Sequence, residues 1–227
     1  MGRSFVFSEN EYYHIYNRGV EKRKIFLDEN DYKRFTSLLF LANSDTSVHL
    51  SNYQGVSLLE IPKGNSIVEI GAWCLMPNHF HLLLKEKQKN GISLFMKKLL
   101  TGYSMYFNTK RHRRGVLFDG TFKAKHLNSD NYLKYQYAYI HLNPIGVIDN
   151  GWKEKKIKNI KKAKQFLFSY KYSSFQDYLG IKRDENNILS TKGFPEYFES
   201  SSDFEEMICE WLSFQENIDI KNIKDTP

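Results

Sequence analysis

The sequence has only two cysteines and no long apolar run, and both absences narrow the class of protein. Cys74 and Cys209 lie far apart, without the short spacings of zinc-thiolate sites, so neither a disulfide framework nor a structural zinc site is indicated. A reducing, cytoplasmic setting is therefore expected. No window approaches the ~20 apolar residues that span a membrane, and residues 1–19 lack the apolar segment of a secretion signal, so we expect no membrane partner.

Basic and aromatic residues are plentiful. There are 33 Lys and Arg against 26 Asp and Glu, for a formal net charge of +7, together with 15 Tyr and 17 Phe. This balance suits a polyanion whose bases can stack on aromatic rings, although many ordinary soluble proteins are equally basic. The charge is therefore weak support for a nucleic-acid partner.

Hydrophobic periodicity predicts the order of the secondary-structure elements along the chain. Strands are expected at residues 12–17, 67–75, 79–85 and, as a short strand or hairpin edge, 116–122; amphipathic helices are expected at 28–43, 91–108, 132–141 and 203–216. Ser129 and Asp130 are candidate caps of the third helix, and Pro144 follows its end. Residues 43–66 are expected to form a long loop, with a possible hairpin around 56–61.

The order strand, helix, strand, strand, helix, strand predicts an α+β fold of the ferredoxin-like kind. In that fold an antiparallel sheet has helices packed on one face, and the third helix would follow it. After Asn150 the composition changes to a lysine-rich run, 153–164, and then to an aromatic, serine-rich stretch. We therefore expect a first domain at 1–150 and a basic, helical C-terminal extension at 151–227 that packs on it.

Two histidines stand two residues apart in the segment WCLMPNHFHLLLK, residues 73–85. Because side chains alternate across a strand, His79 and His81 share one face while Phe80 occupies the other. Two neighbouring imidazoles on a rigid strand can hold a divalent metal ion. Taken alone, such a pair is more often structural than metal-binding.

The segment YIHLNP, residues 139–144, supplies complementary groups. Tyr139 and Asn143 stand four residues apart, so on a continuous helix they share one face. Asn143 can donate an oxygen ligand and Tyr139 can act as a nucleophile toward phosphorus. Two nitrogens and one oxygen fit Mg²⁺ or Mn²⁺ better than structural zinc. Against this, tyrosines at helical spacing are usually packing residues.

Basic residues flank these segments and are candidate phosphate contacts. They are Arg18, Arg111, Arg113, Arg114, Lys123 and Lys125. The run from Lys153 to Lys164 is more typical of a solvated surface than of a specific DNA-binding element, and Arg18 could simply stabilise its turn.

The motifs PNHFH and YIHLNP, with YHIYNRGVEKRKIF, GTFKAK and YSSFQDYLG, resemble the HUH-superfamily single-tyrosine transposases. The similarity is closest to the REP-associated tyrosine transposases of the IS200-like family. The resemblance implies that His79, His81 and Asn143 bind Mg²⁺ or Mn²⁺ and that Tyr139 cuts single-stranded DNA beside a hairpin. It further implies a 5′-phosphotyrosine intermediate, no organic cofactor and a possible homodimer. Thr121 stands where many relatives carry Arg, which removes one expected DNA contact.

Three functions are therefore compared. The first is metal-dependent DNA cleavage and strand transfer in DNA transposition. The second is a non-catalytic nucleic-acid-binding module on the same fold. The third is a metal-dependent phosphoesterase that uses water, for which Tyr139 would be dispensable.

Overall fold

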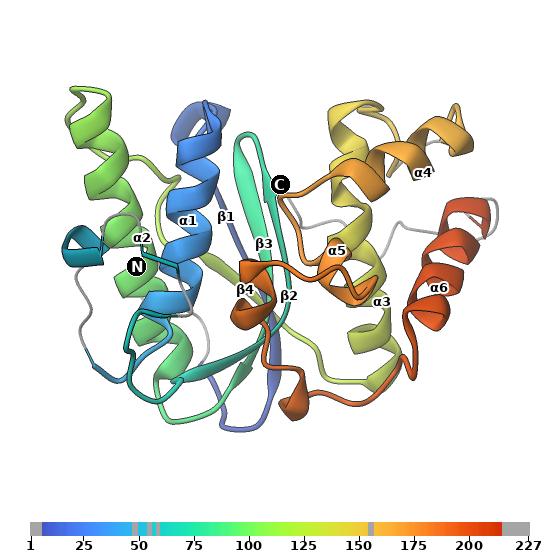
Figure 1. The fold of residues 1–227 in the computed structure, drawn as a ribbon, viewed down its shortest axis with the longest axis horizontal. Coiled ribbons are helices and arrows are strands. Elements are labelled where there is room, and N and C mark those ends of the chain that lie inside the picture. Colours follow the sequence, from blue (N-terminus) through green and yellow to red (C-terminus); the bar gives the residue numbers. More distant parts are fainter. Residues whose placement is uncertain (1–5, 47–49, 54–55, 58–59, 154–156, 215–227) are drawn as a thin grey trace.

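The centre of the fold is an antiparallel sheet whose strands lie in the order β2-β3-β1-β4 (Figure 1). The structure is a computed structural model that describes residues 6–46, 50–53, 56–57, 60–153 and 157–214. The strands are β1 (Tyr12–Arg18), β2 (Val68–Met76), β3 (His79–Glu86) and β4 (Lys123–His126). The four-stranded sheet with its helices confirms the predicted α+β class, and the antiparallel pairing of β2 with β3 across the turn at Pro77 and Asn78 is confirmed too.

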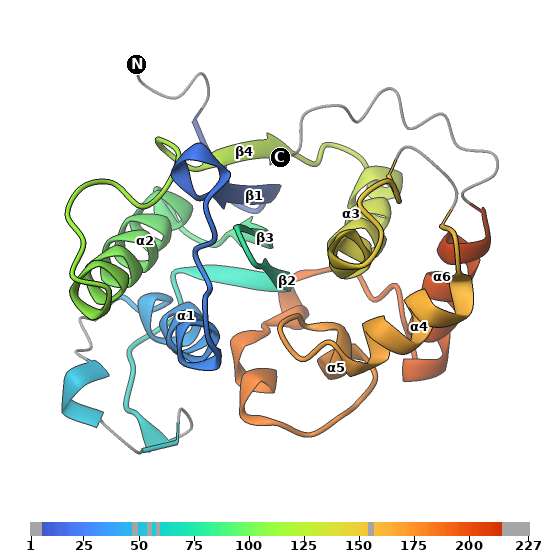
Figure 2. The same ribbon diagram turned by 90° about the horizontal axis from the view of Figure 1, so that it is seen from above.

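The long helices α1 (Glu29–Ala42) and α2 (Gly91–Lys110) cover one face of this sheet (Figure 2). On that face the buried side chains of Phe80, Leu82 and Leu84 share one apolar core with Phe35 and Phe95 of the helices. Burial of this apolar surface is the main force that holds the helices against the sheet. The faces of β3 are thus divided as the alternation predicts, with Phe80 inside this core.

Helix α3 (Asp130–Leu142) covers the opposite face, the face of His79 and His81. Its N-terminus is capped by Ser129, whose side chain accepts a hydrogen bond from the backbone N–H of Tyr132. Tyr137 and Ile140 pack there against Cys74 and other residues of the sheet. The prediction of this helix and of its cap is confirmed.

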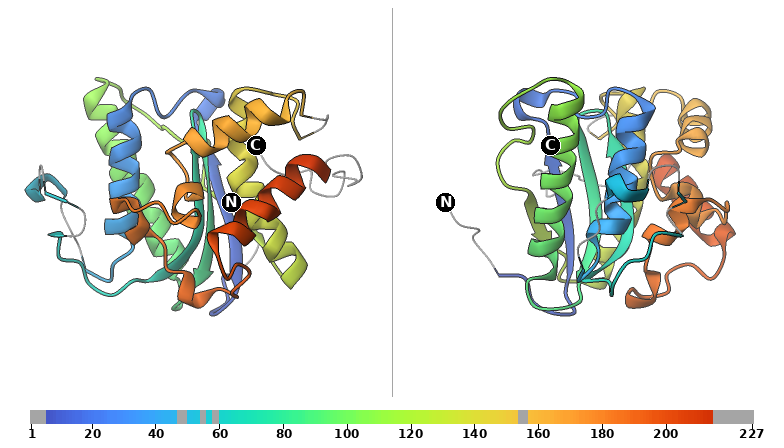
Figure 3. Two further views of the ribbon diagram at one scale, coloured as in Figure 1. Left: turned by 45° about the vertical axis from the view of Figure 1, so that its right-hand side comes forward. Right: turned by 60° about the vertical axis from the view of Figure 1, so that its left-hand side comes forward.

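Two of the three C-terminal helices, α4 (Ile160–Ser169) and α6 (Ser201–Phe214), lie on the outer side of α3, whereas α5 (Phe175–Tyr178) lies beside β2 (Figures 1, 2 and 3). Ala138 and Leu142 of α3 share an apolar cluster with Leu167, Phe175 and Phe204. A division into two domains at residue 150 stays a prediction.

Short 3₁₀ helices connect these elements. They are η1 (Val20–Lys22), η2 (Leu50–Tyr53), η4 (Asn143–Val147), η5 (Asp184–Ile188) and η6 (Thr191–Gly193). The loop predicted at 43–66 contains no strand among its described residues, and part of the possible hairpin lies outside them. No helix in the described ranges is long and apolar enough to cross a membrane.

The prediction of a strand at residues 116–122 is wrong. These residues form a loop with a single isolated bridge between Phe118 and Gly19, and the strand begins only at Lys123. Gly115 and Gly120 both have positive φ, which interrupts an extended run at each end. Phe118 and Phe122 are apolar because they fill the core on the α2 side, so their pattern reflects burial of a loop.

Candidate active site

The two predicted ligand histidines lie next to each other on β3. The rings of His79 and His81 have centroids 5.0 Å apart and are nearly perpendicular. The Nε2 atom of each ring is buried and has no hydrogen-bond partner. Buried polar atoms are nearly always paired, so two unpartnered imidazole nitrogens side by side are candidate metal ligands.

The other ring nitrogen of each histidine is engaged. Nδ1 of His79 lies 2.7 Å from Oδ1 of Asn78, an atom that can only accept, so the proton is on Nδ1 and the Nε2 lone pair is available. Nδ1 of His81 lies 2.9 Å from Nε2 of His14. Such outer partners orient metal-binding imidazoles and set their tautomers.

His14 was not among the predicted site residues. The His14 side chain, on β1, is 1 % exposed. Tyr16 pairs with His81 across the two strands, so His14, two residues before Tyr16, lies diagonally opposite His81 on the same face of the sheet. Its position within an aromatic strand, two residues from Tyr16, is the only local signal, and the strand order was needed to interpret it.

All three imidazoles are kept neutral by their surroundings. Burial lowers the pKa of His79 to about 3, with further contributions from the charges of Lys153 and Arg18. Burial likewise lowers the pKa of His14 to about 3 and holds the pKa of His81 well below its ordinary value. Neutral imidazole is the form that coordinates a metal ion.

Tyr139 of α3 and Asn143, the residue that follows α3 and begins η4, lie across from these rings. The Tyr139 ring lies 5.7 Å from that of His81 and 5.9 Å from that of His14, measured between centroids. One turn later, Nδ2 of Asn143 donates to the backbone carbonyl of Tyr139 at 2.7 Å. That bond uses the nitrogen of the amide and leaves the oxygen as the atom suited to a metal ion.

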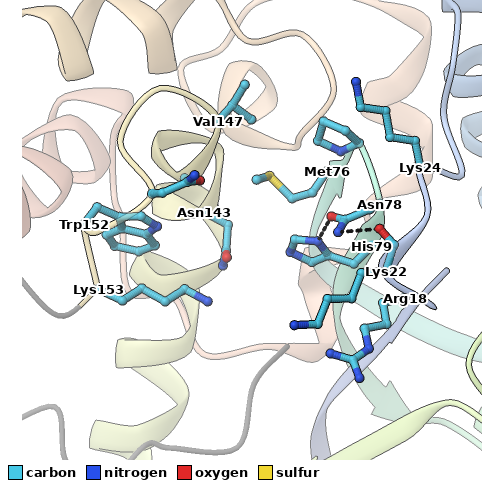
Figure 4. A pocket seen from close by; sticks show the side chains of 13 residues that line it. Arg18, Lys22, Lys24, Met76, Asn78, His79, Asn143, Val147, Trp152 and Lys153 are labelled. Atoms are coloured by element: carbon cyan, nitrogen blue, oxygen red, sulfur yellow. Dashed lines mark hydrogen bonds between the residues drawn. The ribbon is translucent and has the colours of Figure 1, made fainter. Parts of the chain in front are cut away.

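A pocket of about 610 Å³ lies between the two walls. His79 and Asn143 line it from opposite sides, and Figure 4 shows their side chains facing one another across it. The cations Arg18, Lys22, Lys24 and Lys153 also line the pocket, and no carboxylate of the described residues does. The pocket therefore suits a ligand with several negative charges.

The donor set fits a divalent cation. His79 and His81 offer two nitrogen lone pairs and Asn143 an amide oxygen. Within the described ranges no group of three His, Cys, Asp or Glu could hold a metal ion. Mixed nitrogen and oxygen sets with open positions are compatible with Mg²⁺ or Mn²⁺.

The predicted phosphate contacts separate into two groups. Arg18, Lys123 and Lys125 lie opposite His79, Tyr16 and His14 in the strand register, so they share the face of the histidines. Arg18 also lines the pocket, and its Nε forms an ion pair at 3.1 Å with Asp119, which is not among the lining residues.

The second group lies at the C-terminal end of α2, on the other side of the sheet. Arg111 is bound to the carboxylates of Asp28 and Asp31. Arg113 donates to Oδ1 of Asn108 at 2.7 Å, and Arg114 is exposed. The structure does not bring these three arginines to the pocket. Thr121 is exposed in the loop before β4.

Sequence reasoning missed three pocket lysines. Lys22 ends η1, just after β1, and Lys24 follows it. Glu21 and Lys22 both have φ of 58°, a strained conformation for residues other than glycine. Lys153 was assigned to a solvated run, yet its Nζ donates to the hydroxyl of Tyr139 at 2.6 Å. Nothing in the local sequence separates Lys153 from its neighbouring lysines.

Comparison with solved structures shows the same fold elsewhere. The structure of "the REP associates tyrosine transposase bound to a REP hairpin" matches with a TM-score of 0.51 and 12% identity, over 88% of this chain and 96% of that one. A putative transposase from Deinococcus radiodurans R1 matches with a TM-score of 0.34 and 17% identity, over 60% and 92%. A tRNA(His) guanylyltransferase from Saccharomyces cerevisiae matches with a TM-score of 0.37 and 12% identity, over 76% and 77%. Only the first is close enough to support an argument about the fold.

The family comparison agrees with that fold. None of the curated proteins matches the chain significantly. Residues 58–143, however, match the family model "Transposase IS200 like", a range that contains His79, His81, Tyr139 and Asn143. Through this segment the chain is similar to the IS200-like transposases.

Proposed function

We propose that this chain is a transposase that cleaves single-stranded DNA at hairpin-bearing sites through a covalent link to Tyr139 and then transfers the strand. The observation that carries the proposal is the pair of buried, unpartnered Nε2 atoms of His79 and His81 on the wall opposite Tyr139 and Asn143. Unpartnered imidazole nitrogens are suited to binding a metal ion, and a phenol and an amide oxygen lie across from them.

The chemistry follows from the groups present. The phenol oxygen of Tyr139 forms a bond to phosphorus, the bond from phosphorus to O3′ breaks, and the phenol proton is transferred to the released 3′ oxygen. The products are a 5′-phosphotyrosine and a free 3′-hydroxyl, and the reverse reaction rejoins a strand without an external energy source. A divalent ion, Mg²⁺ or Mn²⁺, held by His79, His81 and Asn143 would draw charge from the phosphate oxygens.

The other pocket residues suit the backbone of a DNA strand. Arg18, Lys22 and Lys24 present positive charge around the space beside His79. Each phosphate they neutralise would release a counterion and add to affinity. A hairpin substrate is proposed because a structure with the same fold is described as bound to a REP hairpin.

One assay separates this function from its two rivals. The substrate is a hairpin oligonucleotide copied from repeats that flank the gene, labelled at its 3′ end, because a 5′-phosphotyrosine retains the downstream fragment. We expect a labelled adduct that survives denaturation when Mg²⁺ or Mn²⁺ is present. Tyr139→Phe should abolish it.

Tyr135→Phe is the matched control. Tyr135 lies one turn earlier on α3, with its ring centroid 6.0 Å from that of Tyr139. This substitution also removes one phenolic hydroxyl, but not that of the proposed nucleophile. Adduct that persists in Tyr139→Phe refutes the assignment of the nucleophile. Cleavage without adduct in that variant identifies water as the nucleophile, and binding without cleavage by the wild type identifies a non-catalytic module.

Two further expectations belong to the same proposal. A homodimer is tested by the molar mass in light scattering, with and without the hairpin. A cytoplasmic setting agrees with Cys74, whose buried thiol is free.

A further inference from the structure

Lys153 reaches the active site because the chain turns back after α3. The helix continues into η4, and the backbone N–H of Asp149 donates to the carbonyl of Ile145 at 2.8 Å. Trp152 then packs, 5 % exposed, in the apolar cluster of the C-terminal helices. A Cβ atom at Gly146 would lie 3.2 Å from Nε1 of Trp152, so the close approach of η4 and Trp152 favours glycine there. This packing anchors the residue next to Lys153.

The side chain of Lys153 contacts Tyr139 in two ways. Its Nζ donates to the Tyr139 hydroxyl oxygen at 2.6 Å and lies 4.9 Å from the centroid of the same ring. Figure 4 shows it extending into the pocket from the wall of Asn143, across from His79. The ammonium group is therefore placed at the reacting oxygen of the proposed nucleophile.

The charge of Lys153 has no acidic partner in the pocket lining, as far as the described residues show. Burial lowers the pKa of Lys153 to about 8, so the group still carries its proton in most molecules at neutral pH. Holding an ammonium group in such a place costs folding free energy, because it loses water without gaining a carboxylate. Charges kept at this cost in a cleft are concentrated at functional sites.

We propose that Lys153 is a catalytic residue that holds the Tyr139 oxygen by its hydrogen bond and supplies the positive charge beside it during attack on phosphorus. The inference rests on the proposed function. The bonds that form and break are those described above, and Lys153 keeps its protons throughout. Its hydrogen bond to the phenol oxygen favours negative charge on that oxygen and on the phosphate oxygens next to it.

The test measures the rate of adduct formation in a single turnover at saturating hairpin, together with the Kd for the hairpin. Lys153→Met removes the charge and keeps the aliphatic stem, Lys153→Gln is a second neutral variant, and Lys153→Arg keeps the charge. Lys161→Met is the matched control, because Lys161 belongs to the same lysine-rich run but is exposed on α4.

A folded neutral variant should lose about 10²- to 10³-fold in rate, the effect of removing one charge-stabilising donor, while its Kd changes less than about threefold. Lys153→Arg should recover part of the rate, and Lys161→Met should behave as the wild type. The melting temperature of Lys153→Met should stay equal or rise, which a purely structural lysine would not allow.

The inference is overturned if a folded neutral variant reacts within about threefold of the wild type, or if weaker hairpin binding accounts for the whole loss. In either case Tyr139→Phe still decides the proposed function independently, because it removes the nucleophile and leaves Lys153 in place.

Discussion

Lowering the pH from 7.0 to 5.5 should strongly destabilise the metal-free protein, because four imidazoles are buried without charge. Burial lowers the pKa of His14, His79 and His141 from the ordinary 6.5 to about 3, and holds the pKa of His81 well below 6.5. In the unfolded chain each of these groups takes up a proton near pH 6.5.

The sign and size follow from linkage between protonation and folding. The unfolded state binds more protons between pH 6.5 and 3, so stability is fully present above 6.5 and falls as the pH decreases through that window. Each imidazole contributes a loss of about 1.3 kcal/mol between pH 7.0 and 5.5, and the four together about 5 kcal/mol. This total is an upper bound, since burial raises the pKa of Glu86 and Asp177 and their titration acts in the opposite direction. It is comparable to the whole stability of a typical domain.

Urea unfolding in the presence of a chelator, at pH 7.0, 6.0 and 5.5, measures this loss. The chelator matters because a bound metal ion would oppose protonation of its ligands. His141→Gln provides the internal check, since His141 lies away from the pocket, with its Nδ1 2.8 Å from the Tyr137 carbonyl and its Nε2 2.7 Å from Oγ of Ser174. That variant should lose about 1.3 kcal/mol less than the wild type over the same pH interval. Equal unfolding free energies at pH 7.0 and 5.5 would refute the assignment of neutral, buried imidazoles.

Three further predictions concern metal and DNA. Mn²⁺ at a hundred times its Kd should raise the unfolding free energy of the wild type by about 2.7 kcal/mol and leave that of His79→Gln unchanged, as measured by thermal unfolding. An equal rise in melting temperature in both proteins would place the ion elsewhere. His14→Phe should weaken Mn²⁺ binding in calorimetry by about 10- to 100-fold, because it removes the partner of Nδ1 of His81, and an unchanged affinity would contradict that role. Lys22→Ala should weaken hairpin binding and make the slope of log K against log salt concentration shallower by about 0.7 to 0.9. Arg113→Ala, on the other side of the sheet, should leave both unchanged. Identical slopes in the wild type and Lys22→Ala would exclude a phosphate contact at Lys22.

Features that depend on neighbouring residues could be predicted from the sequence. The alternation along β3 placed His79 and His81 together on one face, and Phe80 on the other, before any fold was known. The offset of four residues placed Tyr139 of α3 and its C-cap Asn143, which keeps a helical backbone conformation, one turn apart. Strand and helix periods are local properties of the backbone, so these expectations needed no information about distant parts of the chain.

The same local rules failed where burial and conformation disagree. Residues 116–122 have the apolar pattern of a strand, but Gly115 and Gly120 interrupt the extended run and the aromatic side chains are buried from a loop. An apolar residue pattern records burial, and burial is not confined to regular structure.

By itself the sequence determined the first three strands, the helices α1, α2, α3 and α6, the histidine pair and the offset of Tyr139 and Asn143, because each is set by spacing along a few residues. Only the tertiary structure decided that His14 supports His81, that Lys123 rather than Arg111 shares the face of the histidines, and that Lys153 reaches Tyr139. These relations join residues through strand order and through the return of the chain over α3. They depend on which surfaces pack together, and no local period encodes that.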